Sequence, residues 1–237
     1  MLILAFETSA KAASVALMDE NRLLGESYQN TGMTHSQTLL VMAEDLLKSC
    51  GKTARDVTAV AVAEGPGSFT GVRIGAAAAK GFAWGREIPC YGVSTLEAMA
   101  ESLGIYQGYV CPVMDARRSQ VYNALFYADE GSIQRHSEDR AISLADLSSQ
   151  LEYLDGPVFL GGDGSNLAYT ALKDRCPELV LPPEHRMHQR AVGVAILARR
   201  MAQAGFSPSG GELAPNYLRL SQAEREKLAR ENKTKGE

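Results

Sequence analysis

The sequence predicts an α/β protein built from two copies of one unit, and three observations support this prediction. The chain has 237 residues, which suits one large domain or two small ones. Strand and helix patterns follow the order βββαβαβα over about the first 103 residues. The same order begins again at Tyr109, and short motifs match at equivalent places in the two copies. We therefore interpret the chain as an internal duplication.

Apolar runs predict the strands of the first half, and helical spacing predicts its helices. The first three strands are joined so closely that they must form an antiparallel meander. A helix that ends at Gly51 and a β-branched strand follow them. The expected strands cover residues 2–6, 14–18, 23–28, 57–63 and 91–93, and the expected helices cover 35–50, 71–85 and a segment that Ser94 and Glu97 open as a capping box.

The second half repeats this order in a shorter form. We expect it to cover residues 104–220, against 1–103 for the first half. A long amphipathic helix over 189–204 is a candidate to pack back on the first half. Residues 221–237 are almost all polar or charged and are expected to form a flexible tail. The expected strands are 109–114, 121–128, 133–137, 158–160 and 180–181, and the shorter helices are 143–151, capped by Ser143 and Asp146, and 166–176.

The matching motifs lie where strands end. Glu7 closes the first strand, and Asp115 closes the first strand of the second half. The loop Gly65-Pro66-Gly67-Ser68 corresponds to Gly162-Asp163-Gly164-Ser165. Chance similarity between glycine-rich loops is the alternative to duplication, but the shared order of elements favours duplication.

Composition excludes several classes of protein. The net charge of −4 argues against a protein that grips nucleic acid by itself. No apolar run approaches the roughly 18 residues that a membrane helix needs. The four cysteines do not form a CxxC pair, so we expect buried thiols in a cytoplasmic protein: Cys50, Cys90, Cys111 and Cys176.

Two loops are candidates for binding a nucleotide. Glu7 at the end of a strand, followed by Thr8 and Ser9, is suited to cradle a phosphate and hold its metal, with Asp115 facing it from the second half. Gly67 lies in a glycine loop that opens a helix, a geometry that suits anions. The alternatives are an ordinary turn and a tight strand-to-helix connection.

The helix over 71–85 is rich in glycine and alanine, which requires an explanation because glycine destabilises a helix by about 0.8–1 kcal/mol relative to alanine. Close approach by another element is that explanation. The element is either the protein's own sheet or a helix of a partner.

Catalytic and metal motifs are scarce. His185 and His188 are three residues apart, but no further ligand is near them in sequence. A polar cluster is formed by Asp115, Arg117 and Arg118 with Tyr122. The alternative is that these residues form an ordinary surface turn.

Taken together, the motifs resemble the TsaB (YeaZ) family over residues 2 to about 220. The order of two specific runs, Gly65–Gly75 and Met114–Arg118, makes the resemblance strong. The other segments that carry it are Ala5–Ser9, Thr34–Ser36, Gly92–Glu97, Val121-Tyr122 and Pro215–Arg219.

The resemblance implies an actin-like (ASKHA) fold with two RNase H-like halves. It also implies a role in forming threonylcarbamoyladenosine at position 37 of tRNAs that read codons beginning with A. In that pathway a TsaD-type paralogue transfers the threonylcarbamoyl group, TsaB-type proteins pair with it through their N-terminal helices, and a TsaE-type ATPase joins them.

Two departures from related motifs bear on activity. Thr95 and Met99 stand where TsaD-type proteins carry an HxxxH metal pair, and neither suits a hard or borderline cation. Arg117 stands where actin-like ATPases have the glycine of an Asp-x-Gly loop, so its side chain is expected to crowd a phosphate.

The resulting prediction is a non-catalytic partner subunit of a TsaD-type enzyme, which forms a homodimer when alone and contacts tRNA only indirectly. An actin-like ATPase is the main alternative, and a metallopeptidase is less favoured. No metal is expected, and ATP or ADP with Mg²⁺ at the cleft or at the partner interface is the one cofactor considered. The expected partner interface consists of His35, Leu39, Met42, Arg73, Gly75, Ala78 and Phe82.

Overall fold

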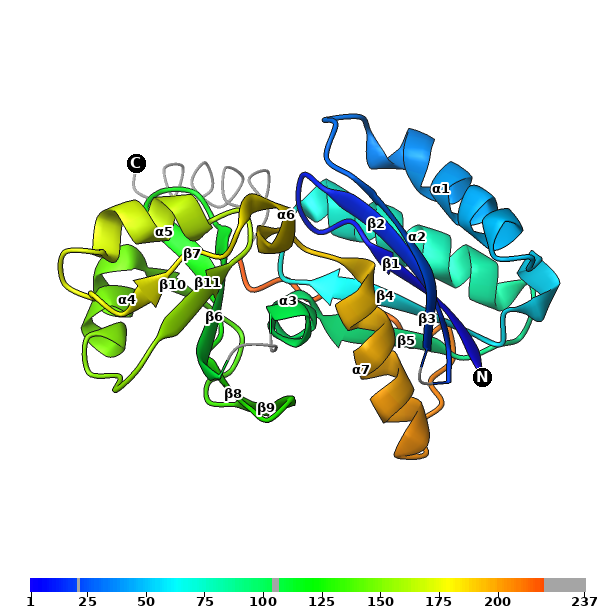
Figure 1. Cartoon of the computed structure of the whole chain (residues 1–237). Coiled ribbons are helices and arrows are strands. Elements are labelled where there is room, and N and C mark those ends of the chain that lie inside the picture. The colour runs from blue at the N-terminus through cyan, green and yellow to red at the C-terminus, as the bar shows by residue number, and fades with distance from the viewer. Residues whose placement is uncertain (21, 104–106, 220–237) are drawn as a thin grey trace, which may run out of the picture.

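The computed structural model describes residues 1–20, 22–103 and 107–219. Two sheets lie side by side, with helices on their outer faces and between them (Figure 1). The predicted tail over 221–237 lies outside the described residues. No helix among the described residues is long and apolar enough to cross a membrane.

The first half is a five-stranded sheet in the order β3-β2-β1-β4-β5. The first three strands form the predicted antiparallel meander, and β4 and β5 add in parallel to β1. The predicted elements are confirmed to within a few residues, and a short 3₁₀ helix, η1, was not expected. The elements are β1 (Leu2–Glu7), β2 (Ala13–Asp19), β3 (Arg22–Gln29), α1 (His35–Ser49), η1 (Ala54–Asp56), β4 (Ala59–Gly65), α2 (Phe69–Trp84), β5 (Cys90–Ser94) and α3 (Thr95–Leu103).

The second half is a seven-stranded sheet whose main path is β10-β7-β6-β11-β12, with β8 paired to β6 and β9 to β8. This path repeats the order of the first sheet, as a duplicated RNase H-like unit requires. Its elements are β6 (Gly108–Asp115), β7 (Gln120–Asn123), β8 (Phe126–Asp129), β9 (Ser132–Arg135), β10 (Arg140–Ser143), α4 (Leu144–Leu151), β11 (Val158–Gly161), α5 (Ser165–Leu172), β12 (Leu179–Val180), α6 (Glu184–Met187) and α7 (Ala191–Gln203).

The strand expected over 121–128 is wrong as a single strand, because it divides into β7 and β8. Pro112 in the partner strand β6 has no N–H to donate, so the ladder is interrupted there. The side chain of Asn123 fills the gap, and its Nδ2 donates to the Pro112 carbonyl at 3.1 Å and to the Ala124 carbonyl at 3.0 Å.

Both predicted caps form, but in different ways. Ser143 caps α4, accepting from the N–H of Asp146 at 3.1 Å. At α3 the Oγ of Ser94 accepts from the N–H of Glu97 at 3.2 Å. The reciprocal half of that capping box is absent, because the Glu97 carboxylate instead pairs with Arg135 on β9 at 2.5 Å.

The last helix of each half covers the sheet of the other half. Helix α3 packs with β6 and β8 in one buried cluster, whereas α7 packs with β1, β2 and β4 in another. The two helices also touch each other, because Gly193 of α7 lies against the backbone of Ala98 in α3. A Cβ atom at Gly193 would overlap the Ala98 carbonyl oxygen.

Substitution of two helix glycines by alanine is therefore expected to change the free energy of unfolding in opposite directions. Gly193→Ala is expected to lower the free energy of unfolding by about 1–3 kcal/mol, because α3 and α7 must move apart. Gly81→Ala on α2, where a Cβ meets nothing within 4 Å, is expected to raise it by about 0.5–1 kcal/mol. Urea unfolding of the two variants measures this difference, and equal stabilisation by both would contradict the packing of α3 on α7.

Candidate functional site

The candidate site lies where the carboxyl ends of the central strands of the two sheets face each other. Glu7 ends β1 and Gly65 ends β4, while Asp115 ends β6 and Gly161 ends β11. In α/β sheets this edge collects the loops that bind ligands. The carboxylate of Asp163, which follows β11, acts electrostatically on Glu7, and the carboxylate of Asp115 acts on Asp163, so the predicted residues of the two halves do converge.

Glu7 is fully buried at this junction of the two sheets. Its Oε1 accepts the backbone N–H of Ser9 at 2.6 Å, but Oε2 has no partner among the described residues. Burial raises the pKa of Glu7 to about 7, with the nearby Asp163 carboxylate adding to the increase. Burial likewise raises the pKa of Asp163. The junction therefore disfavours additional negative charge near neutral pH.

The loops beside Glu7 do not fit a phosphate group. The Thr8 hydroxyl donates to the Gly71 carbonyl at 2.8 Å, and the Ser68 N–H donates to the Ser9 carbonyl at 2.7 Å. A Cβ at Gly67 would lie 2.5 Å from the Ser9 carbonyl oxygen. The glycines thus allow the chain to pack against itself, and the Thr8 hydroxyl and the Ser68 N–H are already used, whereas the buried Ser9 hydroxyl has no partner among the described residues.

The carboxylates at this junction are not arranged as a metal site. The Asp115 carboxylate accepts the N–H of Arg117 at 2.7 Å and is exposed. Within the described residues, no group of three or more His, Cys, Asp or Glu side chains lies close enough to hold a metal ion. Nucleotide with Mg²⁺ at these side chains stays a prediction.

The polar cluster after β6 is an exposed loop with unusual backbone geometry. Arg117, Arg118 and Ser119 all have positive φ angles, of 66°, 57° and 56°. Non-glycine residues seldom adopt this left-handed conformation, and three in succession store strain. Tyr122, which was expected in this cluster, is instead buried in the core below it.

The segment that contains the resemblance motif Pro215–Arg219 joins the two halves. This C-terminal strap, residues 213–219, crosses from the first half to the second (Figure 1). The Asn216 N–H donates to the Glu64 carbonyl at 2.7 Å, and the Tyr217 ring stacks on Phe69 with centroids 4.2 Å apart. The far end is fixed by Arg219, whose Nη1 donates to the Ala116 carbonyl at 2.5 Å. Its sequence signal was the motif Pro215–Arg219, which contributes to the family resemblance.

Three residues predicted for the partner interface are wrong. Leu39 and Met42 are only 1% and 4% exposed and belong to the core between α1 and the sheet. Gly75 is buried against the first sheet, because a Cβ there would overlap the Thr8 hydroxyl and approach Val62. The glycines of α2 at positions 71 and 75 therefore serve the protein's own packing.

The other predicted interface residues lie at or near the surface. His35 begins α1 and is half-buried, with its Nε2 2.8 Å from the Ala10 carbonyl oxygen. Arg73 is exposed, and its Nε donates to the Tyr217 hydroxyl at 2.7 Å. Ala78 and Phe82 are partly buried along the edge of the core.

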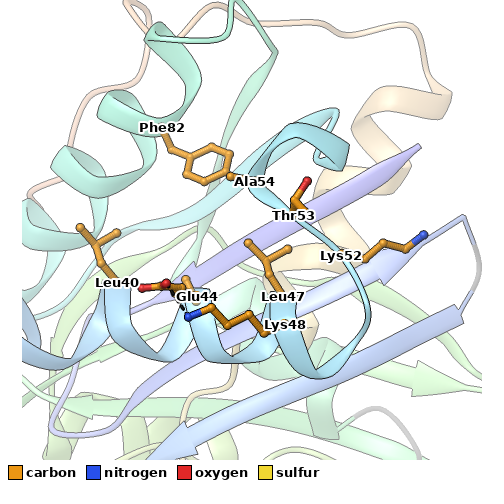
Figure 2. Close-up of a pocket in the computed structure, with 9 residues that line it drawn as sticks. Leu40, Glu44, Leu47, Lys48, Lys52, Thr53, Ala54 and Phe82 are labelled. Carbon is orange, nitrogen blue, oxygen red and sulfur yellow. Dashed lines mark ion pairs between the residues drawn. The ribbon is translucent and has the colours of Figure 1, made fainter.

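The outer face of α1 carries apolar side chains that the sequence analysis missed as surface residues. Leu40 and Val41 are 57% and 56% exposed. Leu40 also lines an apolar groove of about 400 Å³ between α1, η1 and α2, with Leu47 and Phe82 as its other large apolar walls (Figure 2). The ion pair Glu44–Lys48, at 2.6 Å, borders this groove.

The fold defines the class of protein. Two sheets of equivalent strand order, each with the last helix of the other half packed on it, make this an actin-like α/β protein. A family model described as tRNA N6-adenosine threonylcarbamoyltransferase, TsaD, matches residues 29–225.

Curated relatives narrow this class. The chain is 33% identical to the tRNA threonylcarbamoyladenosine biosynthesis protein TsaB of Bacillus subtilis, over 94% of this chain and 96% of the relative. It is 34% identical to TsaB of Escherichia coli, over 92% and 95% respectively. The structure of YeaZ from Pseudomonas aeruginosa matches with a TM-score of 0.74 and 28% identity, covering 92% of this chain and 99% of that one. The chain belongs to the TsaB family.

The buried carboxyl group predicts how stability depends on pH. Since the pKa of Glu7 is raised from 4.5 to about 7 in the folded state, folding favours its protonated form. The free energy of unfolding is therefore expected to fall as pH rises from about 4.5 through about 7, by up to about 3 kcal/mol.

Glu7→Gln provides the matched control, because the amide keeps the acceptor for the Ser9 N–H and removes the charge. Urea unfolding at several pH values should show a smaller decline for this variant than for the native chain. An identical decline in both would assign the pH dependence to other groups, of which Asp163 is the nearest candidate.

Proposed function

We propose that this chain is a partner subunit in the formation of threonylcarbamoyladenosine at position 37 of tRNAs that read codons beginning with A. In this role it binds and supports a TsaD-type threonylcarbamoyltransferase. The observation that carries the proposal is identity of 33–34% over nearly the whole length of relatives named as tRNA threonylcarbamoyladenosine biosynthesis proteins.

A supporting role without catalysis is the second part of the proposal. Thr95 and Met99, at the positions of the HxxxH pair of TsaD-type proteins, are 0% and 3% exposed. Met99 packs among the apolar side chains between α3 and β6, including Leu96 and Leu103. These side chains stabilise the junction of the two halves and offer little to a cation.

The outer face of α1 and α2 is the surface we propose for the partner. Leu40, Val41 and the groove beside Phe82 provide apolar area bordered by charged residues. Such an arrangement suits the apolar face of a helix from another subunit. The same surface serves the proposed homodimer when the partner is absent.

The other members of the complex with the TsaD-type partner, and the place of that complex in the cell, are still predictions. A TsaE-type ATPase is expected to join the complex in the cytoplasm. ATP or ADP with Mg²⁺ is still the expected cofactor. Because the loops beside Glu7 pack against each other, we expect it at the interface with the partner.

Reconstitution tests the function. Threonylcarbamoylation with purified pathway proteins is expected to fall at least about tenfold when this chain is left out, as a required subunit implies. The modified nucleoside, measured by mass spectrometry after digestion of the tRNA, is the readout. Undiminished modification without the chain would refute the proposed role.

The partner surface has its own test. Leu40→Asp is expected to weaken binding to the TsaD-type partner by at least about tenfold, because it places a charge in an apolar contact. Its exposure of 57% means that the fold should tolerate the change. Leu167→Asp on α5, 43% exposed, is the matched control and should bind normally in the same calorimetric titration. Equal affinities for both variants would place the interface elsewhere.

A further inference from the structure

The loop that joins β6 to β7 displays two guanidinium groups that the protein does not use for its own packing. Arg117 and Arg118 are both exposed. Among the described residues, their side chains take part in no hydrogen bond, ion pair or cation–π contact. The loop nevertheless holds a strained left-handed backbone over residues 117–119. A strained loop that presents free charges is typical of a binding surface.

Other parts of the chain hold this loop in place and add charge beside it. Asp115 accepts the N–H of Arg117 at 2.7 Å, so this carboxylate fixes the backbone turn. Arg219 of the strap reaches under the loop, and its Nη1 lies 2.5 Å from the Ala116 carbonyl oxygen and 3.5 Å from that of Arg117. Three arginines from two distant segments are therefore gathered at one place.

The β1–β2 turn borders the same region. Ala10 packs against the buried cluster that includes Ala116 and Leu218, and the next residue, Lys11, is exposed. Exposed cations from both halves thus lie around this loop, although the whole chain has a net charge of −4. The groove on α1 and α2 is lined by none of these residues.

We propose that Arg117, Arg118 and Arg219 form a contact site for the phosphate backbone of RNA. The choice of RNA over other polyanions rests on the proposed function in tRNA modification. Guanidinium groups bind phosphate oxygens through two parallel hydrogen bonds and stay charged at every physiological pH. Contacts of this kind position an RNA without reading its sequence.

This site changes the expectation that tRNA is contacted only indirectly. A few phosphate contacts give weak binding by themselves at physiological salt. Within an assembly they add to the contacts of the catalytic subunit and orient the bound tRNA. The negative net charge of the whole chain is then compatible with a local cationic site.

The test uses the complex of this chain with its TsaD-type partner and fluorescently labelled tRNA. Arg117→Glu/Arg118→Glu is expected to weaken tRNA binding by about tenfold or more at low salt. The slope of log affinity against log salt should become less steep by roughly 1–2, as expected for the loss of one or two phosphate contacts. Arg117→Lys/Arg118→Lys, which keeps the charge, should retain most of the affinity.

The matched control reverses the same number of charges elsewhere. Arg22 and Lys173 are exposed cations at the opposite ends of the strands, and Arg22→Glu/Lys173→Glu should bind tRNA with the native salt dependence. Equal affinity and slope for the loop variant and the native complex would overturn the proposal. Loss of the partner from the loop variant, seen by size-exclusion chromatography, would also overturn it by making the loop a protein contact. The readout is independent of the modification assay, so failure of that assay leaves this result interpretable.

Discussion

The contact between α3 and α7 is the constraint on which the rest of the structure depends. Each helix follows one sheet in the chain and covers the other sheet, so neither half completes its core alone. Gly193 lets the two helices approach to the distance at which the Ala98 carbonyl occupies the place of a side chain. This approach sets the separation of the two sheets, and with it the distance between the ends of β1 and β6.

The junction that results brings together the loops that follow β1, β4, β6 and β11. Glu7 is buried there with one carboxylate oxygen unpaired, and the Thr8 hydroxyl and the Ser68 N–H donate within these loops, whereas the Ser9 hydroxyl has no partner among the described residues. The strap also connects the two halves, since the Tyr217 ring stacks on Phe69 of the first half while Arg219 donates to the Ala116 carbonyl of the second.

The duplication has given the two halves different surfaces. In the first half, α1 and α2 lie side by side and leave apolar area at Leu40, Val41 and the groove beside Phe82 (Figures 1 and 2). In the second half the equivalent helices, α4 and α5, are each eight residues long. The charge there gathers instead in the loop after β6. One half thus supplies the proposed protein contact, and the other supplies the proposed RNA contact.

The sequence by itself determined the duplicated α/β fold, the family, and most helices and strands. Periodicity and turn residues act locally, so Gly51 could be recognised as the end of a helix and Ser143 as the start of one. The sequence did not predict that the strand over 121–128 divides in two, because the division is caused by Pro112 on a neighbouring strand. Only the tertiary structure decided that Leu39, Met42 and Gly75 face the core and that Tyr217 and Arg219 join the halves. It also decided that Arg117 and Arg118 have no partners among the residues the structure describes. These facts depend on which elements become neighbours, and a pattern along one chain does not encode the distance between residues far apart in it.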